Sequence, residues 1–214
     1  MQADLRPHHA RYSFLDARGG DAGNESMSIA RRRGGWLATS HLQLTLPEAL
    51  TCDIEWHLEP DLATHVIYIS TVDHWAQEYY LEAAVTGNGL IASRKGPDGP
   101  TQVEMGWGPD VELDHLSACF TTVLLARWDL SSRPRRTITS AYIPVEDLMP
   151  EALEQEYGVL EHSDAITRVE RVVPATGSRA EIAVLPGGVV QRYEGLFELD
   201  EWGYDDDEPG VPTK

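Results

Sequence analysis

The sequence predicts an all-β fold: a single curled antiparallel sheet, of the spiral β-roll or half-open barrel type, with one short helix. Polar and apolar residues alternate over most of the chain, which is typical of strands with one wet face and one buried face. Gly- and Pro-rich turn sequences separate these segments at the interval expected of barrels and sandwiches. The 214 residues, of which 42% are apolar, suffice for one domain with a sizeable core.

The domain is expected to span residues 11–199, with a loose tail at each end. Residues 1–10 lack hydrophobic periodicity, and residues 200–214 combine acidic side chains with Pro and Gly. We therefore assign a ligand-binding β-roll to residues 11–199, an N-terminal tail to residues 1–10 and an acidic tail to residues 200–214.

The clearest strand is expected over Thr51–Glu59, where Ile54, Trp56 and Leu58 alternate with polar residues. A second strand is expected over Ala63–Thr71, across a short connection that contains Pro. The shortness of the connection predicts that these two strands form a hairpin.

Two more strands are expected over Gln77–Val85 and Gly89–Lys95. The step Asn88-Gly89 between them favours positive φ, which a tight hairpin turn requires. A second strong turn is predicted at Gly96–Pro100, which contains Pro and Gly around an Asp.

The second half of the chain is expected to hold further strands and the helix. Runs rich in β-branched and apolar residues predict strands over Cys119–Trp128, Arg136–Ile143, Ile166–Val173, Arg179–Leu185 and Val189–Leu199. The helix is predicted at Pro150–Tyr157, because Pro suits a first helical position and Glu151 and Glu154 favour the opening turn.

Charge and cysteine usage narrow the class of partner. The chain has 17 Lys and Arg against 35 Asp and Glu, a formal charge of −18, which argues against binding to nucleic acid or to anionic lipid surfaces. Cys52 and Cys119 form no Cys-x-x-Cys motif, so a zinc site is not expected. With no apolar run long enough to span a bilayer and no signal-peptide pattern, we expect a cytoplasmic protein without membrane insertion.

Motifs for cofactors and catalysis are missing from the sequence. It contains no dinucleotide-binding Gly pattern, P-loop, Gly-x-Ser-x-Gly elbow or His-Glu-x-x-His, so we expect no cofactor and no metal, and we assign no catalytic residue. His57 and His65 flank the first hairpin, but a third metal ligand is lacking. Asp114-His115 places an acid beside an imidazole, but neighbours on a strand point to opposite faces and form no dyad.

Amphipathic aromatic residues carry the most informative chemistry. The chain has six Trp and eight Tyr but only three Phe. Trp and Tyr each combine a flat apolar ring with one hydrogen-bond donor. Such residues suit a pocket for a partly apolar ligand, although core packing with the polar tip at the rim explains them equally. We take Trp56, Tyr68, Trp128 and Tyr142 as candidate ligand-binding residues.

Four short segments also resemble a known family. Gly23-Asn24-Glu25, Gly35-Trp36-Leu37-Ala38, Gln155-Glu156-Tyr157 and the stretch Val189–Phe197 are spread over most of residues 11–199. They resemble, in order, the opening Gly-x-Glu strand, a Gly-Trp turn, a Gln-x-Tyr segment and the closing Tyr-Pro-Gly-Leu-Phe strand of the putative glycolipid-binding family of small bacterial proteins.

The resemblance implies a spiral β-roll with an apolar cavity and a ligand-binding role. It adds Glu25, Gln155, Tyr157 and Tyr193 as candidates for the cavity rim, because these are polar positions at which the resemblance and the strand pattern coincide. Where the family has an arginine pair and a Trp-x-Thr-Arg strand, this chain has one arginine followed by Trp128, and a strand that ends in His rather than Arg.

The partner predicted from these observations is an apolar or amphipathic small molecule, lipid-like or polyketide-like, bound in the β-roll cavity. An alternative is a cofactor-free enzyme of secondary metabolism that folds a polyene or polyketide and promotes its cyclisation or intramolecular cycloaddition, by ordering the substrate and polarising a carbonyl. A third possibility is a cavity filled by side chains and a role in protein interaction. The pattern assigns no oligomeric state.

Overall fold

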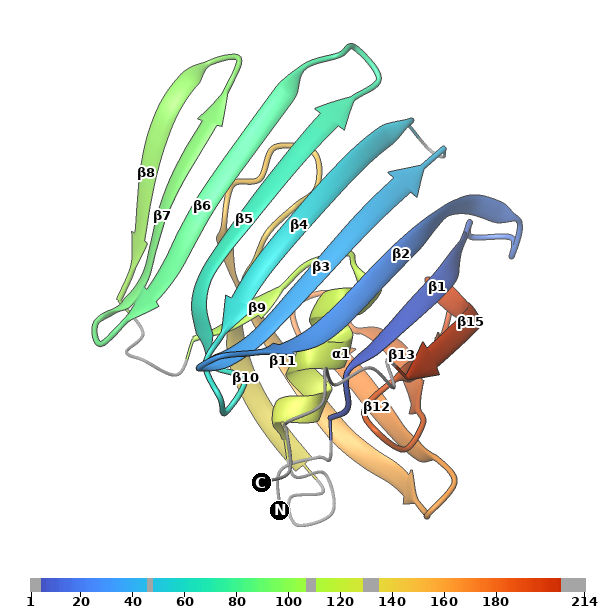
Figure 1. Cartoon of the computed structure of the whole chain (residues 1–214). Coiled ribbons are helices and arrows are strands. Elements are labelled where there is room, and N and C mark those ends of the chain that lie inside the picture. Colours follow the sequence, from blue (N-terminus) through green and yellow to red (C-terminus); the bar gives the residue numbers. More distant parts are fainter. Residues whose placement is uncertain (1–4, 46–47, 107–110, 129–134, 205–214) are drawn as a thin grey trace, which may run out of the picture.

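The computed structural model describes residues 5–45, 48–106, 111–128 and 135–204, and within them the chain forms one 15-stranded sheet and one helix (Figure 1). The N-terminal half of the sheet comprises β1 (His8–Leu15), β2 (Asp21–Arg32), β3 (Gly35–Leu44), β4 (Leu50–Leu58), β5 (Thr64–Asp73), β6 (Glu78–Thr86), β7 (Gly89–Gly96) and β8 (Gly99–Met105). The C-terminal half comprises β9 (Glu112–Asp114), β10 (Arg135–Tyr142), β11 (Glu151–His162), β12 (Thr167–Val173), β13 (Ser178–Val184), β14 (Val190–Tyr193) and β15 (Phe197–Tyr204).

The strands lie in the order β8-β7-β6-β5-β4-β3-β2-β1-β15-β14-β13-β12-β11-β10-β9. Neighbours within each half pair antiparallel, except β9 with β10, and antiparallel pairing of β1 with β15 joins the two halves. Among the described strands only β9 and β10 pair in parallel, because the helix α1 (Ala118–Arg127) provides the crossover that a parallel connection requires. β8 and β9 are the two edges, so the sheet is open, and the prediction of an all-β, mostly antiparallel sheet with one short helix is confirmed.

The predicted hairpins of the N-terminal half are confirmed. Ile54, Trp56 and Leu58 on β4 face the core, and β4 pairs antiparallel with β5 across the short Pro-containing connection. The Asn88-Gly89 step joins β6 to β7, where Gly89 has the positive φ of 126° that this turn requires. The second turn closes β7 onto β8 with Gly96 paired to Gly99.

The position of the helix was predicted wrongly. Cys119–Trp128, expected as a strand, is helical over Ala118–Arg127, with the Ser117 side chain as N-cap accepting from the backbone N–H of Cys119 at 3.1 Å. Every residue from Ala118 to Ala126 is buried. A helix buried on all sides has no amphipathic periodicity, so its apolar run cannot be told from a buried strand. No helix among the described residues is long and apolar enough to cross a membrane.

Pro150–Tyr157, expected as the helix, lies instead in strand β11 from Glu151 onward. Its side chains alternate, with Gln155 and Tyr157 buried and Glu154 and Glu156 exposed. β11 is paired on both sides, with β10 and with β12. Pairing on both edges therefore outweighs the local helix signals of Pro and Glu at the start of the segment.

Three strand boundaries also differ from the prediction. Val189–Leu199 is not one strand, because a turn with Gly195 at φ 71° separates β14 from β15. β1 begins at His8, inside the expected N-terminal tail, and β15 continues to Tyr204, inside the expected acidic tail. Residues 1–4 and 205–214 of those tails lie outside the described residues.

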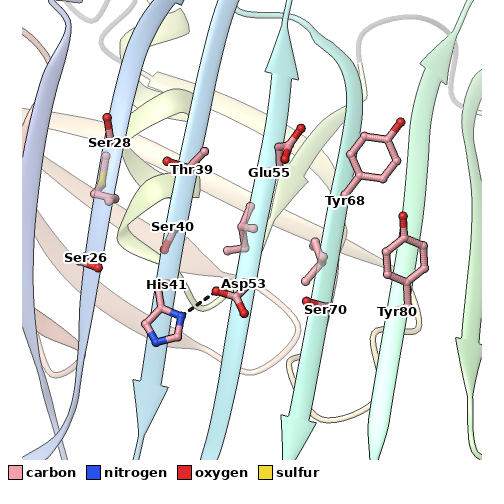
Figure 2. A pocket seen from close by; sticks show the side chains of 13 residues that line it. Ser26, Ser28, Thr39, Ser40, His41, Asp53, Glu55, Tyr68, Ser70 and Tyr80 are labelled. Carbon is pink, nitrogen blue, oxygen red and sulfur yellow. Dashed lines mark hydrogen bonds and ion pairs between the residues drawn. The ribbon is translucent and has the colours of Figure 1, made fainter.

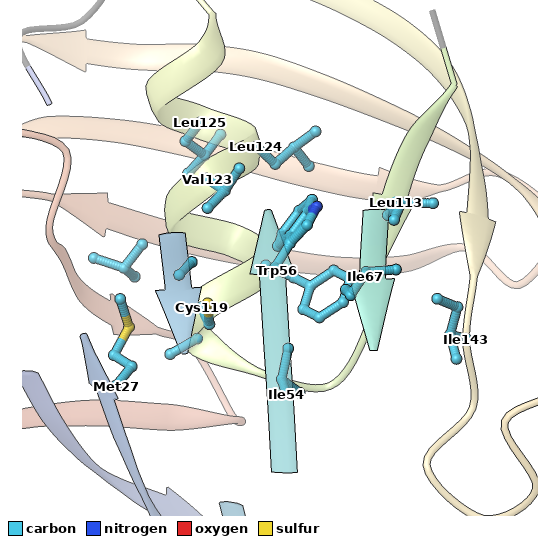
Figure 3. Close-up of a cluster of buried hydrophobic side chains, with 14 of the residues drawn as sticks. Met27, Ile54, Trp56, Ile67, Leu113, Cys119, Val123, Leu124, Leu125 and Ile143 are labelled. Atoms are coloured by element: carbon cyan, nitrogen blue, oxygen red, sulfur yellow. The ribbon is translucent and has the colours of Figure 1, made fainter. Parts of the chain in front are cut away.

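The core lies between the two halves of the sheet, with α1 packed between them (Figures 1 and 3). On the N-terminal side, the ring of Trp56 on β4 lies 4.6 Å from that of Phe120 on α1. On the C-terminal side, the ring centre of Trp128, at the end of α1, lies 4.9 Å from that of Tyr157 on β11. The helix therefore fills the space between the two halves of the sheet, which is open rather than the strongly curled roll that was predicted.

Candidate functional site

A buried polar network on β9 to β12 contains two of the predicted site residues, Gln155 and Tyr157. The Gln155 amide Nε2 donates to Asp114 Oδ2 at 2.6 Å and to Ser140 Oγ at 2.7 Å. Its Oε1 accepts from the Tyr157 hydroxyl at 2.7 Å and from Arg171 Nε at 2.6 Å. We call these five residues the polar network. A single amide therefore links four strands, with both its donor and its acceptor side used.

An ion pair completes the polar network. Arg171 Nη2 lies 3.2 Å from Asp114 Oδ2. Burial raises the pKa of Asp114, and the nearby Arg171 guanidinium and the Gln155 hydrogen bond oppose that rise. A buried carboxylate needs such a counter-charge, because an unpaired charge in the core is strongly destabilising.

Tyr142 and Tyr193, two further predicted residues, lie next to the polar network. Burial, together with the nearby Asp114 carboxylate, raises the pKa of Tyr142 to about 12. Burial also raises the pKa of Tyr193 to about 12, although Arg171 acts in the opposite direction. Both phenols are therefore neutral near neutral pH, as hydrogen-bonding groups rather than bases.

Trp128 lies in a neighbouring cluster around Glu112. Its indole Nε1 donates to Glu112 Oε1 at 3.4 Å, and the Arg136 guanidinium lies 4.7 Å from the centre of its rings. Arg127 Nη1 donates to Glu112 Oε2 at 2.8 Å. Trp128 is thus held by a hydrogen bond and a cation–π contact at the C-terminal end of α1.

Glu25 lies on β2 at the N-terminal end of α1. Its carboxylate accepts from the hydroxyls of Ser40 and Ser117, at 2.6 and 2.5 Å, and from the backbone N–H groups of Ala118 and Cys119, at 2.7 and 3.3 Å. Burial raises the pKa of Glu25, and these hydrogen bonds act against the rise. The carboxylate thus accepts from N–H groups of the first turn of α1, where the Cys119 N–H also donates to Ser117 Oγ, and it fixes α1 against the sheet.

The last two predicted residues lie on opposite faces of the sheet. Trp56 points into the core, where its Nε1 donates to Thr64 Oγ1 at 3.2 Å. Tyr68 points outward, because its neighbours Ile67 and Ile69 are fully buried on the inner face. The structure therefore gathers Tyr142, Gln155, Tyr157 and Tyr193 around one network, with Trp128 packed against the Tyr157 ring. It places Glu25, Trp56 and Tyr68 apart from that network.

Tyr68 belongs to a polar groove on the outer face of β2 to β6 (Figure 2). The groove has a volume of about 610 Å³ and is lined by Ser, Thr and acidic side chains, with Tyr68 and Tyr80 at one side. In it, His41 Nδ1 lies 2.6 Å from Asp53 Oδ1, and both side chains are exposed. This polar lining is what the outer face of an antiparallel sheet presents to water.

An apolar cavity of about 910 Å³ opens at one end of the sheet, and we call it the end cavity. It is formed where the connections β1–β2, β3–β4 and β5–β6 come together, as alternate connections of an antiparallel meander must. Residues before α1, after β10 and between β14 and β15 complete its wall. Its apolar lining consists of Phe14, Leu15, Ala17, Ala22, Leu44, Ala49, Leu50, Trp75, Tyr79, Leu116, Val145 and Leu196.

None of the eight predicted site residues lines the end cavity. The ring centre of Phe197 lies 5.4 Å from that of Phe14 in the cavity wall and 5.5 Å from that of Tyr193, which lies beside the polar network. Sequence reasoning missed the cavity residues because they lie in turns and strand ends, where no periodicity marks them. The exposed Trp75 in the turn after β5 was the one local signal available.

No group of three or more His, Cys, Asp and Glu side chains within the described ranges is arranged to hold a metal ion. His57 and His65 each pair with a glutamate, Glu55 at 2.7 Å and Glu59 at 3.0 Å, on the exposed side of the hairpin. Asp114 and His115 do not interact through their side chains. His115 Nε2 instead lies 4.0 Å from Cys52 Sγ, and burial lowers the pKa of His115 to about 3.

Comparison with known proteins agrees with this architecture. Fold and site define an open, mostly antiparallel β-sheet protein with a helix packed between its halves and an apolar cavity at one end. The sequence profile of the family described as "Putative glycolipid-binding" matches residues 17–198, and the chain belongs to that family. A search of the curated proteins finds no match.

Two solved structures are similar to this chain. A crystal structure of a DUF1089 family protein from Pseudomonas aeruginosa has a TM-score of 0.61 at 17% identity, covering 81% of this chain and 91% of that one. A β-barrel-like protein of the domain of unknown function DUF1849 from Brucella abortus has a TM-score of 0.60 at 10% identity, covering 95% of this chain and 100% of that one. At these identities the likeness shows the fold alone.

Proposed function

We propose that this protein binds an apolar or amphipathic small molecule in the end cavity. The observation that carries the proposal is the cavity itself, about 910 Å³ with a mostly apolar wall. Sites for small molecules are typically clefts of about 300–1,000 Å³, lined by apolar and aromatic side chains with a few polar groups. The membership of a family described as glycolipid-binding supports a lipid-like ligand.

The side chains of the wall suit such a ligand. Trp75, with 67% of its surface exposed, lies at the mouth, and Tyr79 adds a second ring. Aliphatic residues such as Leu50 and Leu116 continue the wall toward α1. Covering this surface with the apolar part of a ligand is favourable by about 25 cal/mol for each Å² removed from water.

The test is to block the cavity and measure binding of the uncharged dye Nile red, whose fluorescence increases in apolar surroundings. Ala49→Trp places a large ring in the cavity lining, and we expect the Kd to rise at least about tenfold. Ala175→Trp, in the exposed turn after β12, is the matched control and keeps the wild-type Kd. Unchanged binding by the Ala49→Trp variant would exclude the end cavity as the site.

Native mass spectrometry of protein purified from its own host identifies the natural ligand. A glycolipid or fatty-acyl species is the expected result. A compact polycyclic metabolite would favour the alternative function as a cyclase, which would then be tested by adding the linear precursor and looking for ring formation.

A further inference from the structure

The polar residues of the end cavity lie at its mouth and are mostly acidic. Asp16, Glu48, Asp73 and Glu146 contribute four carboxylates, against the guanidinium of Arg18 and the imidazole of His74. We call the four carboxylates the acidic rim. They come from two connections, from the last residue of β5 and from the segment after β10, so folding brings them together from positions far apart in the sequence.

Backbone hydrogen bonds hold two carboxylates of the acidic rim in place. Asp16 Oδ1 accepts from the backbone N–H groups of Arg18 and Gly20 at 2.8 and 2.7 Å. Asp73 Oδ1 accepts from those of Trp75 and Gln77, both at 2.9 Å. These two negative charges therefore stay at the mouth when a ligand enters, because they are part of the turns that build it.

The cations at the mouth do not offset the acidic rim. His74 Nδ1 lies 3.4 Å from Glu48 Oε2, so its imidazole already faces a carboxylate. Arg18 is the one guanidinium in the lining. The formal charge of the whole chain, −18, has the same sign as the rim, so long-range attraction adds nothing for an anion.

From this lining we propose, on the basis of the function proposed above, that the head group of the ligand carries no negative charge and donates hydrogen bonds. Hydroxyl and ammonium groups share this chemistry, because both donate to carboxylate oxygens. The apolar part of the ligand lies against the cavity wall, and the head group lies at the acidic rim. A carboxylate or phosphate in the same place meets like charges and finds few donors.

The test compares three probes with the same dodecyl chain length and different head groups: 1-dodecanoylglycerol, dodecylamine and dodecanoate. Their Kd values are measured by displacement of Nile red from the wild-type protein near neutral pH. We expect the glycerol ester and the amine to bind at least about tenfold more tightly than dodecanoate at low salt. At about 1 M salt the difference in Kd between dodecanoate and the other two probes becomes smaller, because charges a few ångströms apart are screened. Tighter binding of the glycerol ester identifies hydroxyl groups as the head group of the ligand, and tighter binding of the amine identifies an ammonium group.

Paired variants assign the selectivity to the rim. The double variant Glu48→Gln and Glu146→Gln removes two negative charges without changing size, and we expect dodecanoate to gain about threefold or more in affinity. The affinity for the glycerol ester does not rise, because its hydroxyls lose two carboxylate acceptors. Glu198→Gln with Glu201→Gln, on β15 outside the cavity lining, is the matched control and leaves all three Kd values unchanged.

The outcomes separate the two proposals. Equal affinity for all three probes, or tightest binding of dodecanoate, overturns the inference about the head group and leaves the proposed function standing. Failure of Nile red and of every probe to bind overturns the proposed function, and the inference falls with it.

Discussion

The polar network and the end cavity have opposite character. In the polar network, the amide of Gln155 has all its hydrogen bonds within the protein, and Asp114 and Arg171 neutralise each other. In the end cavity the lining is apolar and Trp75 is left largely exposed. Satisfied polar groups hold strands together, whereas uncovered apolar surface is what a ligand can use. Stability and binding should therefore be separable by mutation.

The largest effect is expected from removing the counter-charge in the polar network. Arg171→Met leaves the Asp114 carboxylate buried without its cation, and we expect the free energy of unfolding to fall by about 3–5 kcal/mol. Urea unfolding measures the change, and the Kd for Nile red stays at the wild-type value. Arg168→Met, which removes an exposed arginine paired with Glu161 and Glu181, is the control and costs less than about 1 kcal/mol. A comparable loss in both variants would contradict a special role for the buried pair.

The next effect depends on pH and comes from His115. Burial lowers the pKa of His115 from 6.5 to about 3, so between these values the unfolded chain binds a proton that the folded protein does not. The folded state consequently loses stability as the pH falls below 6.5, by about 1.4 kcal/mol per pH unit from this group.

His115→Phe removes that contribution. As the pH is lowered from neutral to 5, the unfolding free energy of the wild type should therefore fall more steeply than that of the variant. Urea unfolding at several pH values measures the slope. His65→Phe, at a position where 67% of the side chain is exposed, is the control. Parallel slopes for wild type and the His115→Phe variant would show that His115 is not held neutral.

A smaller effect, confined to binding, is expected at the mouth of the end cavity. Trp75→Ala removes an exposed ring from the lining, and we expect the Kd for Nile red to rise about five- to tenfold. The unfolding free energy should change by no more than about 0.5 kcal/mol, because the side chain is 67% exposed. Trp202→Ala, on β15 and outside the lining, is the matched control and keeps wild-type binding. Loss of stability with an unchanged Kd would show that Trp75 stabilises the fold and does not contact the ligand.

The smallest effect is expected in the groove on the outer face. Tyr68→Phe removes a hydroxyl that faces away from both the polar network and the end cavity, so Nile red binding should stay within about twofold of wild type. Tyr80→Phe, on the neighbouring strand, serves as a parallel variant in the same fluorescence titration. A marked loss of binding in either variant would move the ligand site to the outer face.

Much of the fold could be predicted because its signals are local. The alternation of Ile54, Trp56 and Leu58 marks β4, and the Asn88-Gly89 step marks a hairpin turn. The helix could not be located in this way. Each residue of Ala118–Ala126 is buried, which removes the periodic contrast on which such a prediction depends.

The candidate site was predictable only in part. Gln155, Tyr157 and Tyr193 follow from the resemblance to the family, and the structure brings them together. Their partners Asp114 and Arg171 are 57 positions apart in the chain, and no local pattern indicates that they meet. The end cavity was even harder to predict from the sequence, because turns from distant parts of the chain form it and only the fold determines which turns lie together.

The pairing of β1 with β15 has a consequence for how the chain folds during synthesis. His8 pairs with Tyr204 and Phe14 with Phe197, so β1 is made before the other described strands but its outer edge stays uncovered until β15 has been made. Each of β2 to β8 pairs with the strand before it in the sequence, whereas the β1–β15 contact joins the first and the last of the described strands. Contacts so distant in sequence make folding slow, and an unpaired strand edge invites association with other chains in the meantime. We therefore expect the nascent protein to depend on chaperones until β15 has been made.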